Sequence, residues 1–129
     1  MSAFLIDTHI YIWADSEPCR LSPQVRAILD NPNHHIYLSM ASLWELQIKM
    51  QLGKLTLNTP LAQAIEHIKA NNLYIILPIK ERDILGLQRL PFHHKDPFDR
   101  LLISQAIHHD LTLITLDEHI VKYDVKCIF

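Results

Sequence analysis

The chain contains very little glycine and cysteine, and both shortages narrow the range of functions. Only two of its 129 residues are glycine, Gly53 and Gly86, so it has no glycine-rich loop of the kind that cradles nucleotide phosphates. The two cysteines, Cys19 and Cys127, stand far apart and lack the close spacing of a cysteine metal site. One disulfide between them stays conceivable, but two inert thiols in a reducing compartment are the simpler expectation.

Long hydrophobic runs and an excess of one charge are also missing. Apolar runs such as residues 73–77 are far shorter than the roughly 20 residues that span a bilayer, and Asp7 interrupts the N-terminus too early for a signal peptide. We therefore expect a cytoplasmic protein without a membrane segment. The formal net charge of −2 is low for a protein that holds RNA by phosphate neutralisation alone, so such binding would need a local basic rim or metal ions.

What the chain does contain is an alternation of short apolar segments with longer segments of helical period. With 49% hydrophobic residues it can form a real core, and we expect one domain over residues 1–129. The alternation predicts an α/β fold with a mostly parallel sheet of four to five strands. The predicted strands are Ala3–Asp7, His35–Ser39, Leu73–Leu77, Leu111–Thr115 and Lys126–Ile128. The predicted helices are Thr8–Ala14, Pro23–Asp30, Met40–Leu52, Pro60–Ala70, Glu81–Leu87 and a last one from Asp96 to about His109.

Four carboxylates stand where an apolar strand passes into a helix, or just inside such a helix. Asp7 and Asp117 each follow a predicted strand, Glu45 lies on a largely apolar helix face, and Asp99 stands in the first turn of the last helix. The carboxyl ends of parallel strands meet at one edge of a sheet, where ligands bind. We therefore expect these acids to form one acidic pocket, which repels itself unless a divalent cation neutralises it.

Each acid alone also has an ordinary structural explanation. Asp7 and Asp117 suit helix N-caps, and for Asp117 the structural and functional explanations are about equal. Glu45 suits an ion pair with Lys49 four residues later, but such a pair is worth only about 0.2–0.5 kcal/mol on an exposed helix. That gain is small against the cost of burying a carboxylate, so a cation explains Glu45 better. No single acid is evidence for a metal site. The argument for one is that all four are expected at the same edge of the sheet.

Asp96 and Asp99 stand three residues apart at the start of the last helix. Asp96 precedes a proline, as an N-cap does, and we interpret it as mainly structural and Asp99 as mainly functional. Thr8 stands beside Asp7 and could orient that carboxylate. Thr115 is a second candidate for such a supporting role.

The chemistry of hard cations then suggests what the acids do. Mg²⁺ and Mn²⁺ prefer oxygen ligands, keep several waters and take one or two protein carboxylates each. One or two such ions can activate a water and stabilise the leaving oxygen in phosphodiester cleavage, at about 3.5–4 Å separation where two are bound. No nucleophilic cysteine or serine stands out, so metal-assisted hydrolysis is the best chemical fit.

Nine histidines raise the question of zinc, and they include the adjacent pairs at 34–35, 93–94 and 108–109. Adjacent side chains point in different directions, so such a pair rarely chelates one ion, and we expect surface or loop histidines. Trp13 and Trp44 suit a core or an interface better than base stacking. The side chains that could contact phosphate beside the site are Lys49, His93, His94, Lys95 and Arg100. Lys49 and Arg100 suit a plain surface charge or an ion pair equally well.

Four segments carry a family resemblance, in this order along the chain. They are Leu-Ile-Asp-Thr at 5–8, Ser-Leu-Trp-Glu-Leu-Gln-Ile-Lys at 42–49, His-Lys-Asp-Pro-Phe-Asp-Arg-Leu-Leu-Ile-Ser-Gln-Ala at 94–106 and Leu-Ile-Thr-Leu-Asp at 113–117. Together they closely resemble the PIN-domain ribonucleases, and among these the VapC-type toxins of bacterial toxin–antitoxin pairs. The resemblance covers essentially the whole chain, and its third segment is the most specific.

The resemblance implies a fold, an activity and partners. The fold would be an α/β/α sandwich, and the four acids would bind Mg²⁺ or Mn²⁺ to cut single-stranded RNA, often a structured RNA such as tRNA. The partners would be a second copy in a homodimer and an antitoxin whose C-terminal segment covers the site. All four acidic positions, Asp7, Glu45, Asp99 and Asp117, are filled, as an active enzyme requires.

Two other functions fit parts of the sequence. A metal-dependent phosphatase on an α/β scaffold would use an aspartate nucleophile, but it usually needs a second aspartate two residues later, where this chain has His9. A non-catalytic module would use the acids only as caps and bind a protein through apolar surface near Trp44. Divalent-cation binding separates that module from both enzymes.

Overall fold

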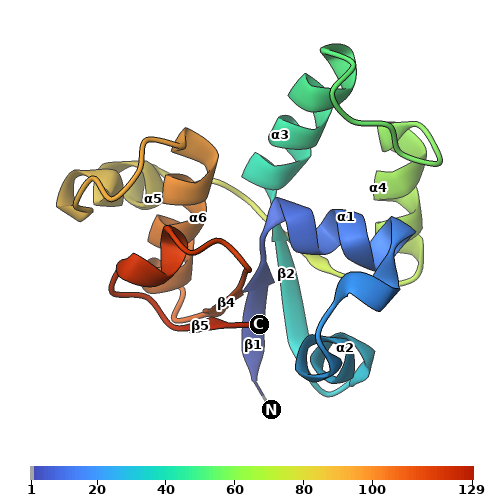
Figure 1. Ribbon diagram of the computed structural model, residues 1–129, viewed down its shortest axis with the longest axis horizontal. Coiled ribbons are helices and arrows are strands. Elements are labelled where there is room, and N and C mark those ends of the chain that lie inside the picture. The colour runs from blue at the N-terminus through green and yellow to red at the C-terminus, as the bar shows by residue number, and fades with distance from the viewer. Residues whose placement is uncertain (1) are drawn as a thin grey trace.

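One central sheet organises the molecule. In the computed structural model, which describes residues 2–129, the sheet has five strands in the order β3-β2-β1-β4-β5, all parallel (Figure 1). The expected α/β class is therefore confirmed, and the sheet is parallel throughout. The strands are β1 (Ala3–Ile6), β2 (His35–Ser39), β3 (Ile75–Leu77), β4 (Thr112–Ile114) and β5 (Cys127–Ile128). Only β2 has the predicted bounds, and the other four strands are each shorter than predicted by one or two residues.

Six α-helices flank the sheet within the described residues and complete an α/β/α sandwich. In Figure 1, α1, α2 and α4 lie on one side of the sheet and α5 and α6 on the other, while α3 rises from the end of β2. The α-helices are α1 (Thr8–Ser16), α2 (Pro23–Asp30), α3 (Met40–Gln51), α4 (Leu61–Ala70), α5 (Glu81–Leu85) and α6 (Pro97–His108). Short 3₁₀ turns are η1 (Pro18–Arg20), η2 (Gly86–Arg89) and η3 (Ile120–Lys122).

The side chains of β1 alternate between two hydrophobic clusters, one on each face of the sheet. Phe4 and Ile6 belong to the cluster under α1 and α2, whereas Leu5 belongs to the cluster under α6. Successive strand side chains point to opposite faces, so this central strand is apolar at every position. Leu5 and Ile6 are completely buried, as expected for a parallel strand covered on both faces.

The direction of the connections changes at β1. From β1 the chain leads outward to β2 and β3 on one side, and β4 and β5 lie on the other side. The crevice beyond the carboxyl ends of β1 and β4 is thus the topological switch point, the usual ligand position in an open parallel sheet. The backbone N–H of Asp7 donates to the carbonyl of Ile114 at 3.1 Å, which fixes these two strand ends together.

Two buried polar side chains hold α6 beside this crevice. The hydroxyl of Ser39, at the end of β2, donates to Oε1 of Gln105 on α6 at 2.5 Å. The amide of Gln105 then donates to the carbonyl of Pro78, just after β3, at 3.2 Å. Because Ser39 and Gln105 are both completely buried, these bonds fix α6 relative to the strand ends with little freedom.

Cysteine and membrane features complete the description. Cys19 is exposed and Cys127 partly buried, and both are free thiols, as the sequence suggested. None of the helices in residues 2–129 is both long and apolar enough to cross a membrane.

Arg100 is a structural residue, which corrects the expectation that it contacts RNA. It is only 6% exposed. Its guanidinium donates to the carbonyls of Leu87 and Leu90 at 3.3 Å each, and to that of Pro91 at 2.8 Å. It also donates to the hydroxyl of Tyr123 at 3.0 Å. The side chain extends from the first turn of α6 toward the segment that precedes the helix. Its guanidinium hydrogen-bonds the backbone carbonyls of that segment.

We expect Arg100→Lys to lower the free energy of unfolding by about 2–4 kcal/mol, because one ammonium group cannot serve four acceptors and leaves carbonyls unsatisfied. Urea denaturation at neutral pH measures this loss. Arg26→Lys, the same change at an exposed position on α2, is the matched control and should alter stability by less than about 0.5 kcal/mol. Equal stability of the two variants would contradict the structural role of Arg100.

Candidate metal centre

Asp7 occupies the carboxyl end of β1 and is both a helix cap and a pocket residue. Its Oδ1 accepts a hydrogen bond from the backbone N–H of Ile10 at 2.9 Å, which caps α1. Its Oδ2 accepts from the hydroxyl of Thr115, after β4, at 2.5 Å. The side chain is 5% exposed, and burial raises the pKa of this carboxyl despite both hydrogen bonds.

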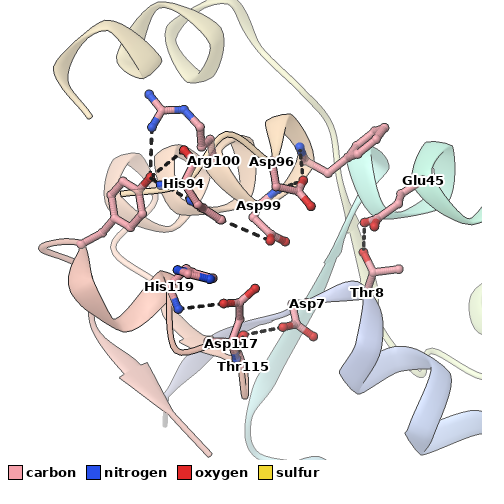
Figure 2. A network of polar contacts seen from close by, with 12 residues as sticks. Asp7, Thr8, Glu45, His94, Asp96, Asp99, Arg100, Thr115, Asp117 and His119 are labelled. Carbon is pink, nitrogen blue, oxygen red and sulfur yellow. Dashed lines mark hydrogen bonds and ion pairs between the residues drawn. The ribbon is translucent and has the colours of Figure 1, made fainter. Parts of the chain in front are cut away.

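Thr115 connects two of the acids. Besides its bond to Asp7, its hydroxyl oxygen accepts the backbone N–H of Asp117 at 3.0 Å. Asp117 in turn accepts the N–H of His119 through Oδ1 at 2.8 Å, in the local bond expected of a cap. Figure 2 shows Asp7, Thr115 and Asp117 side by side at the strand ends. Thr115 therefore has the supporting position that the sequence suggested, and it supports Asp7 directly.

Glu45 enters the site from α3 and is buried. Its Oε1 accepts a hydrogen bond from the hydroxyl of Thr8 at 2.7 Å, and its Oε2 lies 2.9 Å from Nζ of Lys49. The expected contact of Thr8 with Asp7 is therefore wrong. Asp7 turns back to cap α1, whereas Thr8 points across to α3, where Ser42 also lies 3.0 Å from its hydroxyl. The ion pair with Lys49 exists, but it belongs to a buried carboxylate with a second partner.

Asp96 and Asp99 divide their roles at the start of α6. Asp96 is the N-cap, since its Oδ1 accepts the backbone N–H groups of Phe98 and Asp99 at 2.9 and 3.1 Å. Asp99 leaves its carboxylate free of any cap and points it into the crevice (Figure 2). Burial is the main cause that raises the pKa of Asp99 to about 8, and the neighbouring carboxylates of Asp96, Asp117, Asp7 and Glu45 raise it further.

These acids meet in one cavity of about 300 Å³. Asp7, Glu45, Asp99 and Asp117 come from four separate segments and all line it, together with Asp96 and Thr8. The sequence did not identify His9 and Leu116 as site residues, and it assigned Trp13 to a core or interface. All three line the cavity as well. No motif marks them, because they reach the cavity only through the geometry of α1 and of the loop after β4.

The candidate phosphate contacts occupy different positions. Lys49 lines the cavity, while His93 and Lys95 are exposed on the loop before α6. His94 turns inward, with its Nε2 at 3.4 Å from Oδ2 of Asp99. Lys49, His93 and Lys95 are thus the accessible candidates, and His94 is a partly buried neighbour of Asp99.

The donor set fits a hard divalent cation. Carboxylate oxygens dominate the cavity, and the raised pKa of Asp99 shows that proximity and burial disfavour its anionic form when no cation is bound. One ligand atom each from His94, Asp99 and Asp117 lies within 4.8 Å of the other two. A cation held between these side chains would remove the repulsion that the fold imposes.

Comparison with known proteins agrees with this geometry. The PIN domain family model matches residues 4–126. No curated protein sequence matches the chain.

Several solved structures share the fold at low sequence identity. A chain of VapBC2 from Rickettsia felis bound to a promoter DNA fragment aligns with a TM-score of 0.70 and 15% identity, over 98% of this chain and 97% of that one. A chain of FitAcB from Neisseria gonorrhoeae aligns with a TM-score of 0.61 and 21% identity, over 98% and 96%. A chain of the VapBC-5 toxin–antitoxin system from Mycobacterium tuberculosis aligns with a TM-score of 0.62 and 17% identity, over 99% of this chain and 98% of that one. With a family match over nearly its whole length, and a parallel sheet that gathers four acids at its switch point, this chain belongs to the PIN domain family.

Proposed function

We propose that this protein is a divalent-metal-dependent endoribonuclease and the VapC-type toxin of a toxin–antitoxin pair. The observation that carries the proposal is the meeting of Asp7, Glu45, Asp99 and Asp117 in one cavity of a PIN domain. The metal is Mg²⁺ or Mn²⁺ and the substrate is RNA, with a structured RNA such as tRNA as the first candidate. A toxin that acts on such RNA works in the cytoplasm.

Asp7, Glu45 and Asp99 hold the principal cation, and Asp117 completes the pocket or serves a second position. When bound, a divalent cation supplies an activated water and positive charge against the phosphate. The protein itself orients the carboxylates that would bind the cation. Thr115 fixes Oδ2 of Asp7, and Thr8 fixes Oε1 of Glu45, so both carboxylates are held before a cation arrives.

RNA contact outside the acids depends on a few cations. Lys49 lies in the cavity, paired with Glu45, and its ammonium can turn to a phosphate once a metal neutralises that carboxylate. His93 and Lys95 lie exposed on the loop before α6 and offer a rim. Since the whole chain has a net charge of −2, these few side chains and the bound cation supply the local positive potential.

The proposed partners are an antitoxin and a second copy of the chain. Several structural neighbours are themselves toxin–antitoxin complexes, which supports an antitoxin as partner. Exposed apolar side chains on α3 and at its C-cap offer contact surface for either partner, since Trp44 is 59% exposed and Leu52 62%. Such large exposed apolar residues are typical of interaction sites.

The direct test is cleavage of a total RNA pool that includes tRNA, with Mn²⁺ or Mg²⁺ and with EDTA. We expect discrete fragments that disappear with EDTA and with Asp99→Asn, because that variant loses an anionic metal ligand and keeps its shape. Asp124→Asn, the same change at an exposed position that does not line the cavity, is the matched control and should cut normally. Unchanged cleavage by Asp99→Asn would refute the assignment, and phosphate release from small esters with intact RNA would indicate a phosphatase.

Thermal unfolding tests the acid repulsion independently of any substrate. The folded state holds a proton on Asp99 up to about pH 8, whereas the unfolded chain releases it near pH 4, so metal-free stability should fall as the pH rises between these values. Asp99→Asn should flatten that fall and raise the Tm in EDTA at pH 8 by about 3–8 °C. Adding Mn²⁺ should raise the Tm of the wild type and much less that of the variant. Asp124→Asn should resemble the wild type in all of these measurements.

The hydrogen bond from Thr8 to Glu45 predicts a positioning role for Thr8. Thr8→Val keeps the shape and removes the donor, so Mn²⁺ affinity and cleavage should each fall by about 10-fold or more. Thr8→Ser restores the donor and should recover both. Calorimetric Mn²⁺ titration separates this role from a folding defect, and equal Mn²⁺ affinity in the wild type and Thr8→Val would rule it out.

A further inference from the structure

One buried nitrogen next to Asp99, a residue that lines the cavity, has no role in the proposed mechanism. Nε2 of His94 is inaccessible to solvent and has no hydrogen-bond partner, yet it faces the carboxylate of Asp99 at 3.4 Å. The side chain of His94 is 11% exposed. An unpaired polar atom in a buried position carries a free-energy cost, so its retention calls for an explanation.

We propose that His94 is a nitrogen ligand, and that with Asp99 and Asp117 it forms a second cation position that prefers Mn²⁺ to Mg²⁺. This inference rests on the proposed metal centre, because it shares two of the four acids with it. It adds a residue of another chemical class and a choice between the two metals.

The spacing of the three ligand atoms suits a single ion. One atom each from His94, Asp99 and Asp117 lies within 4.8 Å of the other two. Ligands about 2.0–2.2 Å from a common ion stand roughly 3–4.4 Å apart, so only a small inward movement is needed. All three side chains are partly buried, which limits competition from water. In Figure 2 the His94 ring lies next to Asp99, with Asp117 across from them.

The other side of the His94 ring is held in the way that metal-binding histidines usually are. Its Nδ1 lies 2.9 Å from the hydroxyl of Tyr123, and that hydroxyl also accepts a hydrogen bond from Arg100 at 3.0 Å. The ring stacks on His119 at 5.6 Å between centroids, with an angle of 19° between the planes. A polar partner on one ring nitrogen fixes the imidazole and leaves the other for the ion. The hydroxyl oxygen also lies 3.3 Å from the backbone N–H of His94, and its proton can go to the carbonyl of His94 at 3.5 Å, which leaves Nδ1 to carry the hydrogen that binding through Nε2 requires.

Imidazole changes which ion is favoured. Mg²⁺ is bound almost entirely by oxygen, whereas nitrogen ligands favour first-row transition ions, whose affinity rises from Mn²⁺ along the series. Imidazole is also neutral, so it adds a ligand without adding to the repulsion between the acids. A position with one nitrogen and two carboxylates should therefore select Mn²⁺ over Mg²⁺.

The test is pulsed electron paramagnetic resonance of Mn²⁺ bound to the full chain, without RNA. We expect the spectrum to carry ¹⁴N modulation from a directly bound imidazole, and to change when the histidines carry ¹⁵N. His94→Gln should lose the modulation and lower the preference for Mn²⁺ over Mg²⁺ by about 10-fold or more in a competition titration. The labelling experiment uses the wild type, so a poorly folded variant cannot block it.

Two control variants identify the ligand. His9 and His119 are the other histidines close to these acids, and both are exposed. His9→Gln and His119→Gln should each keep the nitrogen modulation. Its absence from the wild type, or its loss in either control with retention in His94→Gln, would overturn the proposal. RNA cleavage without nitrogen modulation would reject the histidine position and keep the ribonuclease. Nitrogen modulation without cleavage of any RNA would support the histidine position and count against the ribonuclease.

Discussion

Repulsion between carboxylates at one end of a parallel sheet is the constraint on which the rest of the site depends. Asp7, Glu45, Asp99 and Asp117 line a single small cavity, and Asp7 and Glu45 are almost fully buried. Burial and the neighbouring carboxylates raise the pKa of Asp99, which shows that this arrangement disfavours its anionic form. A fold that brings such groups together needs rigid supports, and a proton on Asp99 or a bound cation to offset their charge. Both requirements explain features that lie well outside the acids.

The residues that hold α6 and the preceding loop in place do not line the cavity themselves. Gln105 and Ser39 fix α6 to the ends of β2 and β3, and Arg100 fixes the loop before α6 by satisfying three of its carbonyls. Asp99, a proposed metal ligand, stands one residue before this anchor in the first turn of α6. The DPFDR segment at 96–100 thus combines a helix cap, a ligand and an anchor in one turn of helix.

Much of this could be predicted from the sequence, and the failures have physical causes. Strand-then-acid patterns located Asp7 and Asp117, because in a parallel sheet the position along the chain fixes the edge on which a residue emerges. Side-chain direction within a loop or a first helical turn follows no such rule. Thr8 was therefore assigned to Asp7 when it contacts Glu45, and Arg100 was expected to contact phosphate, or to be a surface charge or ion-pair partner, when it is buried against backbone carbonyls. The inward turn of His94 depends on Tyr123, a partner 29 residues away that no local pattern indicates.

Charge balance links the two proposed metal positions to RNA. With one divalent cation, the five carboxylates that line the cavity and Lys49 together still carry a net negative charge, which repels a phosphate. A second dication neutralises the same set, and the whole chain, with its net charge of −2, offers little other attraction. If a further carboxylate held that second ion, the set would be negative again. A neutral imidazole avoids this, so a nitrogen ligand at position 94 lets an acidic pocket hold two ions without repelling a polyanion.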